Sequence, residues 1–157
     1  MARTREQAEE LAWRPWERIG AGEVAQGLAL LDDGGTWWEM ATRSAQPMAR
    51  MKVLLAETFC LFPMRFEPVG SIVEGTRVAL MVESFADLPD GGRYNNAYTF
   101  ITTLHPDEDQ ILHVREYVDT LHASQTLIPA VLSAARGSSA MGDLLGGVGI
   151  SRDDVHG

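Results

Sequence analysis

The 157-residue sequence has only one cysteine, Cys60, so no disulfide bond can form within the chain. Basic residues are in the minority: 13 Lys and Arg stand against 22 Asp and Glu, which gives a formal net charge of −9 at pH 7. An acidic surface repels phosphate groups, so we expect neither a nucleic acid nor an anionic membrane as a partner. Long apolar runs are also absent, and nothing predicts a membrane span or a signal peptide. These absences favour a protein of the cytoplasm.

The sequence also lacks the common signatures of metal and cofactor sites. Its four histidines, His105, His113, His122 and His156, do not have the spacing of a zinc site, and there is no second cysteine. The glycines at 20–22 precede a predicted helix but lack the strand and the further glycines of a phosphate-binding loop. A G-x-S-x-G nucleophile motif is missing as well. We therefore expect neither a metal nor a cofactor.

Hydrophobic residues make up 45% of the chain and charged residues 22%, a balance typical of a globular domain with a packed core. Apolar residues recur first with helical spacing and later with the alternation of strands. Predicted helices cover 4–19, 23–31, 47–61 and 122–135. Predicted strands cover 36–40, 64–74, 77–87, 94–104 and 110–121. Short turns join the last four strands, which predicts an antiparallel meander.

Most helices precede the long strands, so the predicted fold class is α+β rather than a repeating βαβ arrangement. Long strands in one sheet curl, and the N-terminal helices are expected to cover the concave face. The prediction is a curved antiparallel sheet wrapped around these helices, a cone-shaped barrel with an apolar pocket. One domain over residues 1–136 accounts for this pattern, and the glycine-rich segment 137–157 is predicted to be a flexible tail.

Two glutamates stand in rows of apolar residues on the predicted strands. Side chains two residues apart share one face of a strand, so Glu83 lies with Met81, and Glu116 lies between Val114 and Val118. If both faces point into the pocket, burial and mutual repulsion push the pKa values of the two carboxyl groups apart. One could then act as a base while the other stays protonated. The alternative is that an arginine or a tyrosine hydroxyl satisfies each acid, which then only stabilises the sheet.

Further residues are candidates for contact with a ligand. Asn96 and Tyr98 would offer polar groups to a carbonyl or a hydroxyl, and the alternative for both is a buried hydrogen bond. Trp37 and Glu39 share one face of the first predicted strand. The remaining candidates are apolar residues expected in the pocket wall or, alternatively, in the core: Met51, Leu55 and Met81.

Two motifs carry a resemblance to a known family. They are G-x-Y-N-N-x-Y at 92–98 and R-E-Y-V-D-T at 115–120. Together with the order of the elements, they resemble the SnoaL-like branch of the nuclear transport factor 2-like superfamily over about residues 5–132. This branch includes proteins related to ketosteroid isomerase and limonene epoxide hydrolase. The resemblance implies a conical α+β barrel, a homodimer formed through the outer face of the sheet, and a pocket for a small apolar molecule.

The same resemblance implies roles for the two acids. Limonene epoxide hydrolase places an Asp–Arg–Asp arrangement around the attacking water, and Glu83 and Glu116 fall at the two acid positions. Met81 stands at the arginine position and departs from that pattern. Polyketide cyclases and ketosteroid isomerases of this fold use a carboxylate to remove a proton next to a carbonyl, and Glu116 is at a position consistent with that role.

The sequence thus favours an enzyme that uses Glu116 and Glu83 for cofactor-free acid/base chemistry on a steroid, terpenoid or polyketide-like substrate. Such an enzyme would be an isomerase, a cyclase or a hydrolase. The alternatives are a non-catalytic binding protein for a small apolar ligand, an epoxide hydrolase with an altered acid pair, and a protein-interaction domain.

Overall fold

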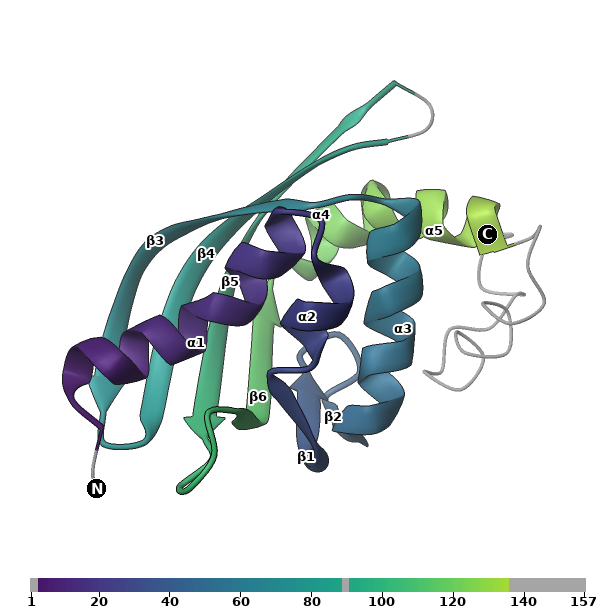
Figure 1. Cartoon of the computed structure of the whole chain (residues 1–157). Coiled ribbons are helices and arrows are strands. Elements are labelled where there is room, and N and C mark those ends of the chain that lie inside the picture. The colour runs from purple at the N-terminus through teal and green to yellow at the C-terminus, as the bar shows by residue number, and fades with distance from the viewer. Residues whose placement is uncertain (1–2, 89–90, 136–157) are drawn as a thin grey trace.

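The computed structural model of the chain describes residues 3–88 and 91–135, and the tail predicted at 137–157 lies outside these ranges (Figure 1). The helices are α1 (Arg5–Gly20), α2 (Val24–Leu28), α3 (Met48–Leu61), α4 (Thr120–Gln125) and α5 (Leu127–Ala135). The helix predicted at 122–135 is therefore divided into α4 and α5. None of the helices in the described ranges is long and apolar enough to cross a membrane.

The first helix shows how local sequence determines a boundary. Thr4 accepts a hydrogen bond from the backbone N–H of Gln7, and the Gln7 side chain accepts one from the backbone N–H of Thr4. This capping box satisfies backbone donors that the start of a helix otherwise leaves free. The helix then continues through Pro15 instead of breaking there.

A six-stranded sheet forms the other half of the domain. Its strands are β1 (Leu31–Glu39), β2 (Ser44–Pro47), β3 (Arg65–Glu74), β4 (Arg77–Asp87), β5 (Arg93–Leu104) and β6 (Ile111–Val118). They lie in the order β2-β1-β6-β5-β4-β3. Strands β3 to β6 pair antiparallel in sequence order, so the predicted meander is confirmed.

The first two strands depart from the prediction. Strand β1 begins at Leu31, within the predicted second helix, and pairs parallel with β6. Strand β2 was not predicted, because its sequence, Ser44–Pro47, has no β-branched or aromatic residue. Both strands depend on partners elsewhere in the sheet rather than on local propensity.

The sheet curves but does not close into a barrel. Among the described strands, β2 and β3 are the two edges of the sheet. Helix α1 packs against β3, β4 and β5, and α3 packs against β1 and β2, so helices cover the concave face (Figure 1). The α+β class and the cone-like curved sheet around N-terminal helices are confirmed, and helices rather than further strands complete the cone.

An aromatic cluster joins α1 to the sheet. The ring of Trp16 stacks on Phe100 of β5 at 4.1 Å between centroids and meets Trp37 of β1 edge-on at 5.9 Å. All three side chains are at most 2% exposed. Large buried aromatic residues dominate core energetics, so this contact fixes where α1, β1 and β5 lie relative to one another.

At Gly35, β1 comes so close to β6 that a side chain does not fit. A Cβ atom on Gly35 would lie 1.6 Å from the carbonyl oxygen of Leu112. The pairing of β1 with β6 also shifts register between Leu31 and Thr36. The glycine therefore allows the irregular stretch that precedes the regular parallel pairing.

We expect the variant Gly35→Ala to lower the free energy of unfolding by about 2 kcal/mol or more, because the backbone of β6 must move to admit the methyl group. Gly34→Ala is the matched control, since its Cβ would lie no closer than 3.3 Å to a neighbour, the Asp32 carboxylate. Its effect should stay below about 1 kcal/mol. Urea unfolding of both variants measures the difference, and equal losses would contradict the close approach.

Candidate functional site

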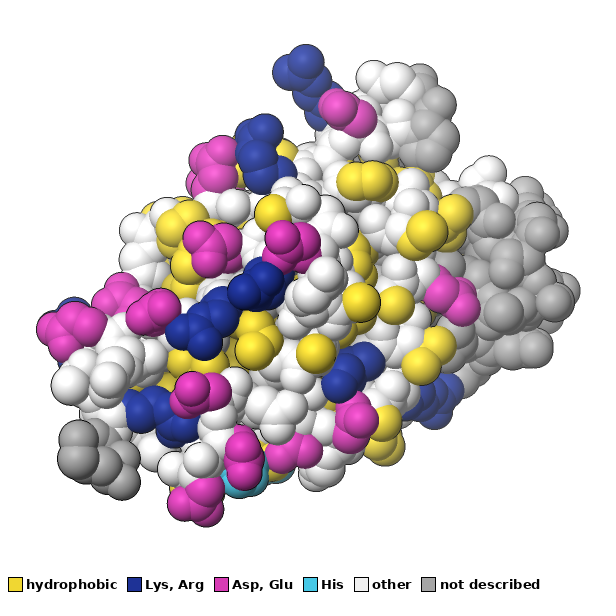
Figure 2. Space-filling view, in the orientation of Figure 1, with side chains coloured by type: hydrophobic (Ala, Val, Ile, Leu, Met, Phe, Trp, Pro, Cys, Tyr) yellow, Lys and Arg dark blue, Asp and Glu magenta, His cyan; other side chains and the backbone are white. Residues whose placement is uncertain are grey.

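Charged side chains on the helix-covered side of the molecule are mixed in sign, as Figure 2 shows. On α1, Arg14 pairs with Glu10 at 2.9 Å, and Arg18 pairs with Glu23 at 2.6 Å. Exposed pairs of this kind contribute about 0–1 kcal/mol each. Since charges of both signs neutralise one another on this face, the interior offers the stronger candidate for a functional site.

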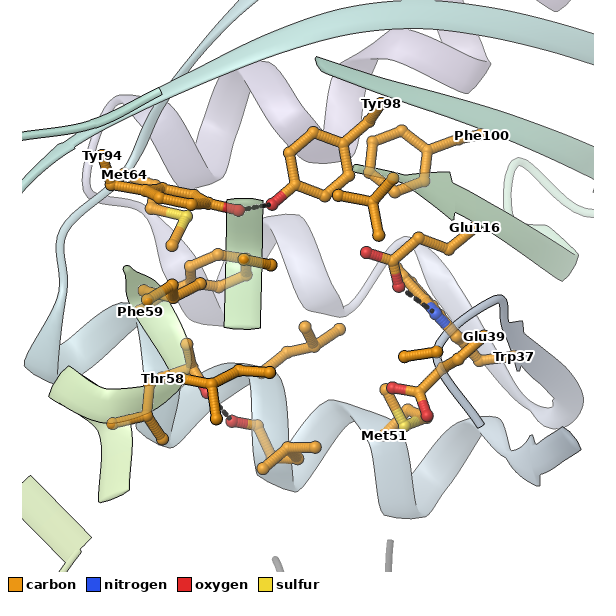
Figure 3. A pocket seen from close by; sticks show the side chains of 18 of the residues that line it. Trp37, Glu39, Met51, Thr58, Phe59, Met64, Tyr94, Tyr98, Phe100 and Glu116 are labelled. Carbon is orange, nitrogen blue, oxygen red and sulfur yellow. Dashed lines mark hydrogen bonds between the residues drawn. The ribbon is translucent and has the colours of Figure 1, made fainter. Parts of the chain in front are cut away.

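A cavity of about 220 Å³ lies between the sheet and helices α3 and α5 (Figure 3). Its walls are largely aromatic and aliphatic, with contributions from Trp16, Met51, Leu55, Phe59, Phe100 and Val131. A small number of polar groups interrupt these walls: Glu39, Thr42, Thr58, Tyr94, Tyr98 and Glu116. A mostly apolar cavity with a few convergent polar groups is typical of a small-molecule site.

The carboxyl group of Glu116 is the most perturbed acid in the cavity. Strand β6 carries it inward, and its Oε2 accepts a hydrogen bond of 2.9 Å from the indole Nε1–H of Trp37. Burial raises the pKa of Glu116 to about 7; the Trp37 hydrogen bond lowers it, and the neighbouring Glu39 raises it further. The other carboxyl oxygen points into the cavity (Figure 3).

The second acid of the cavity is Glu39. It is the register partner of Glu116 in the parallel pairing of β1 with β6, so their Cα atoms sit on neighbouring strands, about 4.8 Å apart. Burial raises the pKa of Glu39, and a 3.3 Å hydrogen bond from the Thr42 hydroxyl opposes this shift. The two carboxyl groups occupy the same wall (Figure 3).

Two phenols from β5 form the other polar feature of the cavity. The hydroxyls of Tyr94 and Tyr98 lie 2.8 Å apart (Figure 3). Burial raises the pKa of both, that of Tyr98 well above its usual value, so both remain protonated near neutral pH. Only one of the two hydroxyl hydrogens can lie between the two oxygens. The pair can therefore donate its second hydrogen elsewhere.

Asn96 holds this pair rather than lining the cavity. Its Oδ1 accepts from the backbone N–H of Ala97 at 2.8 Å, and its Nδ2 donates to the carbonyl oxygen of Asp119 at 3.0 Å. These contacts determine which end of the amide faces Tyr94, whose hydroxyl accepts from Nδ2 at 2.9 Å. Asn96 is 4% exposed, so its contacts match the alternative stated for it, a buried hydrogen bond, rather than direct contact with a ligand.

Most of the predicted site residues do meet in the cavity. Its lining includes Trp37, Glu39, Met51, Leu55, Tyr98 and Glu116. The structure places Glu83 and Met81 on the outer face of the sheet instead, where they line a shallow groove. Glu83 lies 3.4 Å from the amide nitrogen of Asn95 and does not face Glu116. The predicted pair of Glu83 with Glu116 is therefore wrong, and Glu39 takes the place of Glu83.

The error at Glu83 has a simple cause. On β4 the buried row is Val78, Leu80 and Val82, whereas Met81 and Glu83 belong to the outer row. The outer row also contains apolar residues, among them Met81 and Phe85 on either side of Glu83, so the neighbours of Glu83 alone do not show which row faces the core.

Sequence reasoning missed two groups of site residues. Tyr94 lies four residues before Tyr98 on the same face of β5, and that alternation could have identified it as a partner in the site. Helix α5 contributes Leu127, Ile128 and Val131 to the lining. Their spacing of one and three residues places them on one face of the helix, so helical periodicity could have predicted that this face lines the cavity.

The described part of the chain offers little for a metal. Within residues 3–88 and 91–135, no group of three or more His, Cys, Asp and Glu side chains is placed to hold a metal ion. The described residues that line the cavity include no Lys, Arg or His.

The fold and the cavity together define a class of small α+β domains in which helices complete a curved sheet around an apolar cavity. No family model matches the sequence, and no curated protein matches it. Solved structures do match. PrhC from Penicillium brasilianum NBRC 6234 is 18% identical, with a TM-score of 0.73 over 90% of this chain and 98% of that one.

Two further structures resemble the chain. A SnoaL-like protein from Jannaschia sp. CCS1, assigned as a polyketide cyclase, is 18% identical, with a TM-score of 0.65 over 80% of this chain and 95% of that one. TerC, co-crystallised with polyporic acid, is 14% identical, with a TM-score of 0.63 over 76% and 96% of the two chains. At these identities the likeness shows the fold, which is that of the SnoaL-like and nuclear transport factor 2-like proteins. The resemblance stated from the motifs is confirmed at that level.

Proposed function

We propose that the protein is an enzyme for acid/base chemistry on a small, largely apolar carbonyl compound of steroid, terpenoid or polyketide type. One observation carries this proposal. Glu116 has one oxygen held by Trp37 and the other directed into the cavity, and burial raises the pKa of Glu116 to about 7. An acid/base group works best when its pKa lies near the working pH.

The proposed step is the transfer of a proton from carbon. The carboxylate of Glu116 removes a proton from the carbon next to the substrate carbonyl, and the electrons of that C–H bond form the carbon–carbon double bond of an enolate. Negative charge collects on the substrate oxygen, where the spare hydrogen of the Tyr94–Tyr98 pair donates. Glu116 then returns its proton to carbon, so the step consumes no oxidant or reductant.

The similar structures support a small-molecule site in this fold. TerC was crystallised with polyporic acid, and the Jannaschia protein is assigned as a polyketide cyclase. An epoxide hydrolase with an altered acid pair is less well supported, because Glu83 lies outside the cavity and no arginine is among the described lining residues. A binding protein without chemistry would use the same cavity, and the experiment below separates it from an enzyme.

A homodimer formed through the outer face of the sheet remains part of the proposal. On β3, Val69 and Ile72 are 65% and 66% exposed, and Val69 lines the shallow groove with Met81. Burying such residues would stabilise an association. Sedimentation equilibrium should give about twice the chain mass of 17.2 kDa, and the mass of one chain would contradict the dimer.

Proton removal can be measured without knowing the natural substrate. A panel of neutral ketones that includes 2-tetralone is incubated with the protein in D₂O, and exchange next to the carbonyl is followed by NMR. We expect the protein to accelerate exchange and Glu116→Gln to abolish the acceleration, because glutamine cannot accept the proton. As pH falls through about 7, Glu116 becomes protonated, so the rate at pH 6 should be roughly one tenth of that at pH 8.

Glu83→Gln is the matched control, since it changes the same residue type on the outer face of the sheet. It should leave exchange unchanged, and circular dichroism should show that both variants are folded. Acceleration that survives Glu116→Gln, or binding of the ketones without any acceleration, would overturn the enzymatic proposal. Binding without exchange would leave the non-catalytic binding protein as the better account.

A further inference from the structure

The cavity contains two adjacent acids without a basic partner. Glu39 and Glu116 are direct register partners on β1 and β6, and like charges at such positions destabilise a sheet. Among the described residues that line the cavity there is no Lys, Arg or His side chain to balance them. A buried charge costs free energy unless it is paired. When they are ionised, the two acids therefore have no counter-charge among the described residues that line this site.

The carboxyl oxygens also have unused capacity to accept hydrogen bonds. Trp37 donates to one oxygen of Glu116, and Thr42 donates to one oxygen of Glu39. No other side chain or backbone group of the described residues donates to either carboxyl group. An ionised carboxylate can accept about four hydrogen bonds. The oxygen of Glu116 that points into the cavity is thus available to a donor on a ligand (Figure 3).

The surrounding walls suit the apolar body of a ligand. Trp37 lines the cavity beside Glu116, and Trp16, Phe59, Phe66 and Phe100 also line it. Trp16 stacks on the ring of Phe100 at 4.1 Å, so the attraction for a cation comes from the two acids rather than from an open aromatic face. A metal ion fits less well, since hard cations such as Ca²⁺ take about six to eight oxygen ligands and only two carboxyl groups are present.

We propose that the ligand of this cavity carries a positively charged nitrogen, which binds beside Glu39 and Glu116 while its apolar remainder packs against α3 and α5. This inference rests on the proposed function and names the substrate class for the same site. A cation beside Glu116 would favour its ionised form, which is the form that removes a proton. A carbonyl elsewhere on the ligand would reach the Tyr94–Tyr98 pair.

The other titratable groups near Glu39 and Glu116 do not add charge to the cavity. From β5, the groups that face them are the hydroxyls of Tyr94 and Tyr98, which burial keeps protonated. Helices α1, α3, α4 and α5 contribute only uncharged side chains to the lining. Within residues 3–88 and 91–135, the charge of the cavity therefore depends on Glu39 and Glu116.

A matched pair of probes tests the inference without turnover. Benzyltrimethylammonium carries a fixed positive charge at every pH, and neopentylbenzene is its neutral analogue of the same shape. Binding is followed by the fluorescence of the tryptophans, two of which line the cavity. At pH 8 the cation should bind at least about tenfold more tightly than the neutral probe. From pH 8 to pH 6 its affinity should fall roughly tenfold as Glu116 takes up a proton, while that of the neutral probe stays constant.

Glu39→Gln removes one charge and keeps the shape of the side chain. It should reduce the ratio of the affinity for the cation to that for the neutral probe at least about threefold, without lowering the affinity for the neutral probe. Glu83→Gln on the outer face should change neither affinity. Equal or tighter binding of neopentylbenzene to the wild-type protein would overturn the inference. If that result accompanies Glu116-dependent exchange of neutral ketones, the proposed function stands and only the positively charged ligand is rejected. If neither probe binds and no ketone exchanges, both proposals fail together.

Discussion

The indole N–H of Trp37 donates to a carboxyl oxygen of Glu116, and the parallel pairing of β1 with β6 makes this contact possible. The same pairing brings Glu39 beside Glu116. The close approach at Gly35 lets β1 enter the sheet at this place, and the aromatic cluster around Trp16 holds Trp37 in position. The arrangement of the candidate site therefore depends on one long-range strand pairing.

An ionised carboxyl group in this position lowers the stability of the folded state. Raising the pKa of Glu116 from 4.5 to about 7 corresponds to about 3 kcal/mol against the ionised form. The folded state holds this proton more tightly than the unfolded state, so the contribution to stability is full below about pH 4.5 and is lost as pH rises through about 7. An acid kept at such a cost, with a free oxygen directed into a cavity, is better explained by chemistry or binding than by packing. Perturbed acids of this kind cluster at functional sites, which is why Glu116 carries the proposal.

Local pattern predicted much of the fold and part of the site. The inward face of Glu116 followed from its neighbours Val114 and Val118, which share one buried face of β6. The position predicted for Glu83 is wrong because its neighbours Met81 and Phe85 are apolar although they lie on the outer face of β4. Glu39 and Glu116 are far apart in the chain and become neighbours through the parallel pairing of β1 with β6, which no local sequence pattern predicts. For Asn96 the sequence offered a buried hydrogen bond as the alternative to ligand contact, but not its partner, the distant backbone carbonyl of Asp119.

The central claim is that Glu116 titrates near neutral pH inside an apolar cavity. Its pKa can be measured directly by NMR titration of the protein labelled with ¹³C at the glutamate side-chain carboxyl, with Glu116→Gln used to assign the signal. The account predicts a midpoint near pH 7 for Glu116. A midpoint near 4.5, the value of an ordinary exposed glutamate, would contradict it.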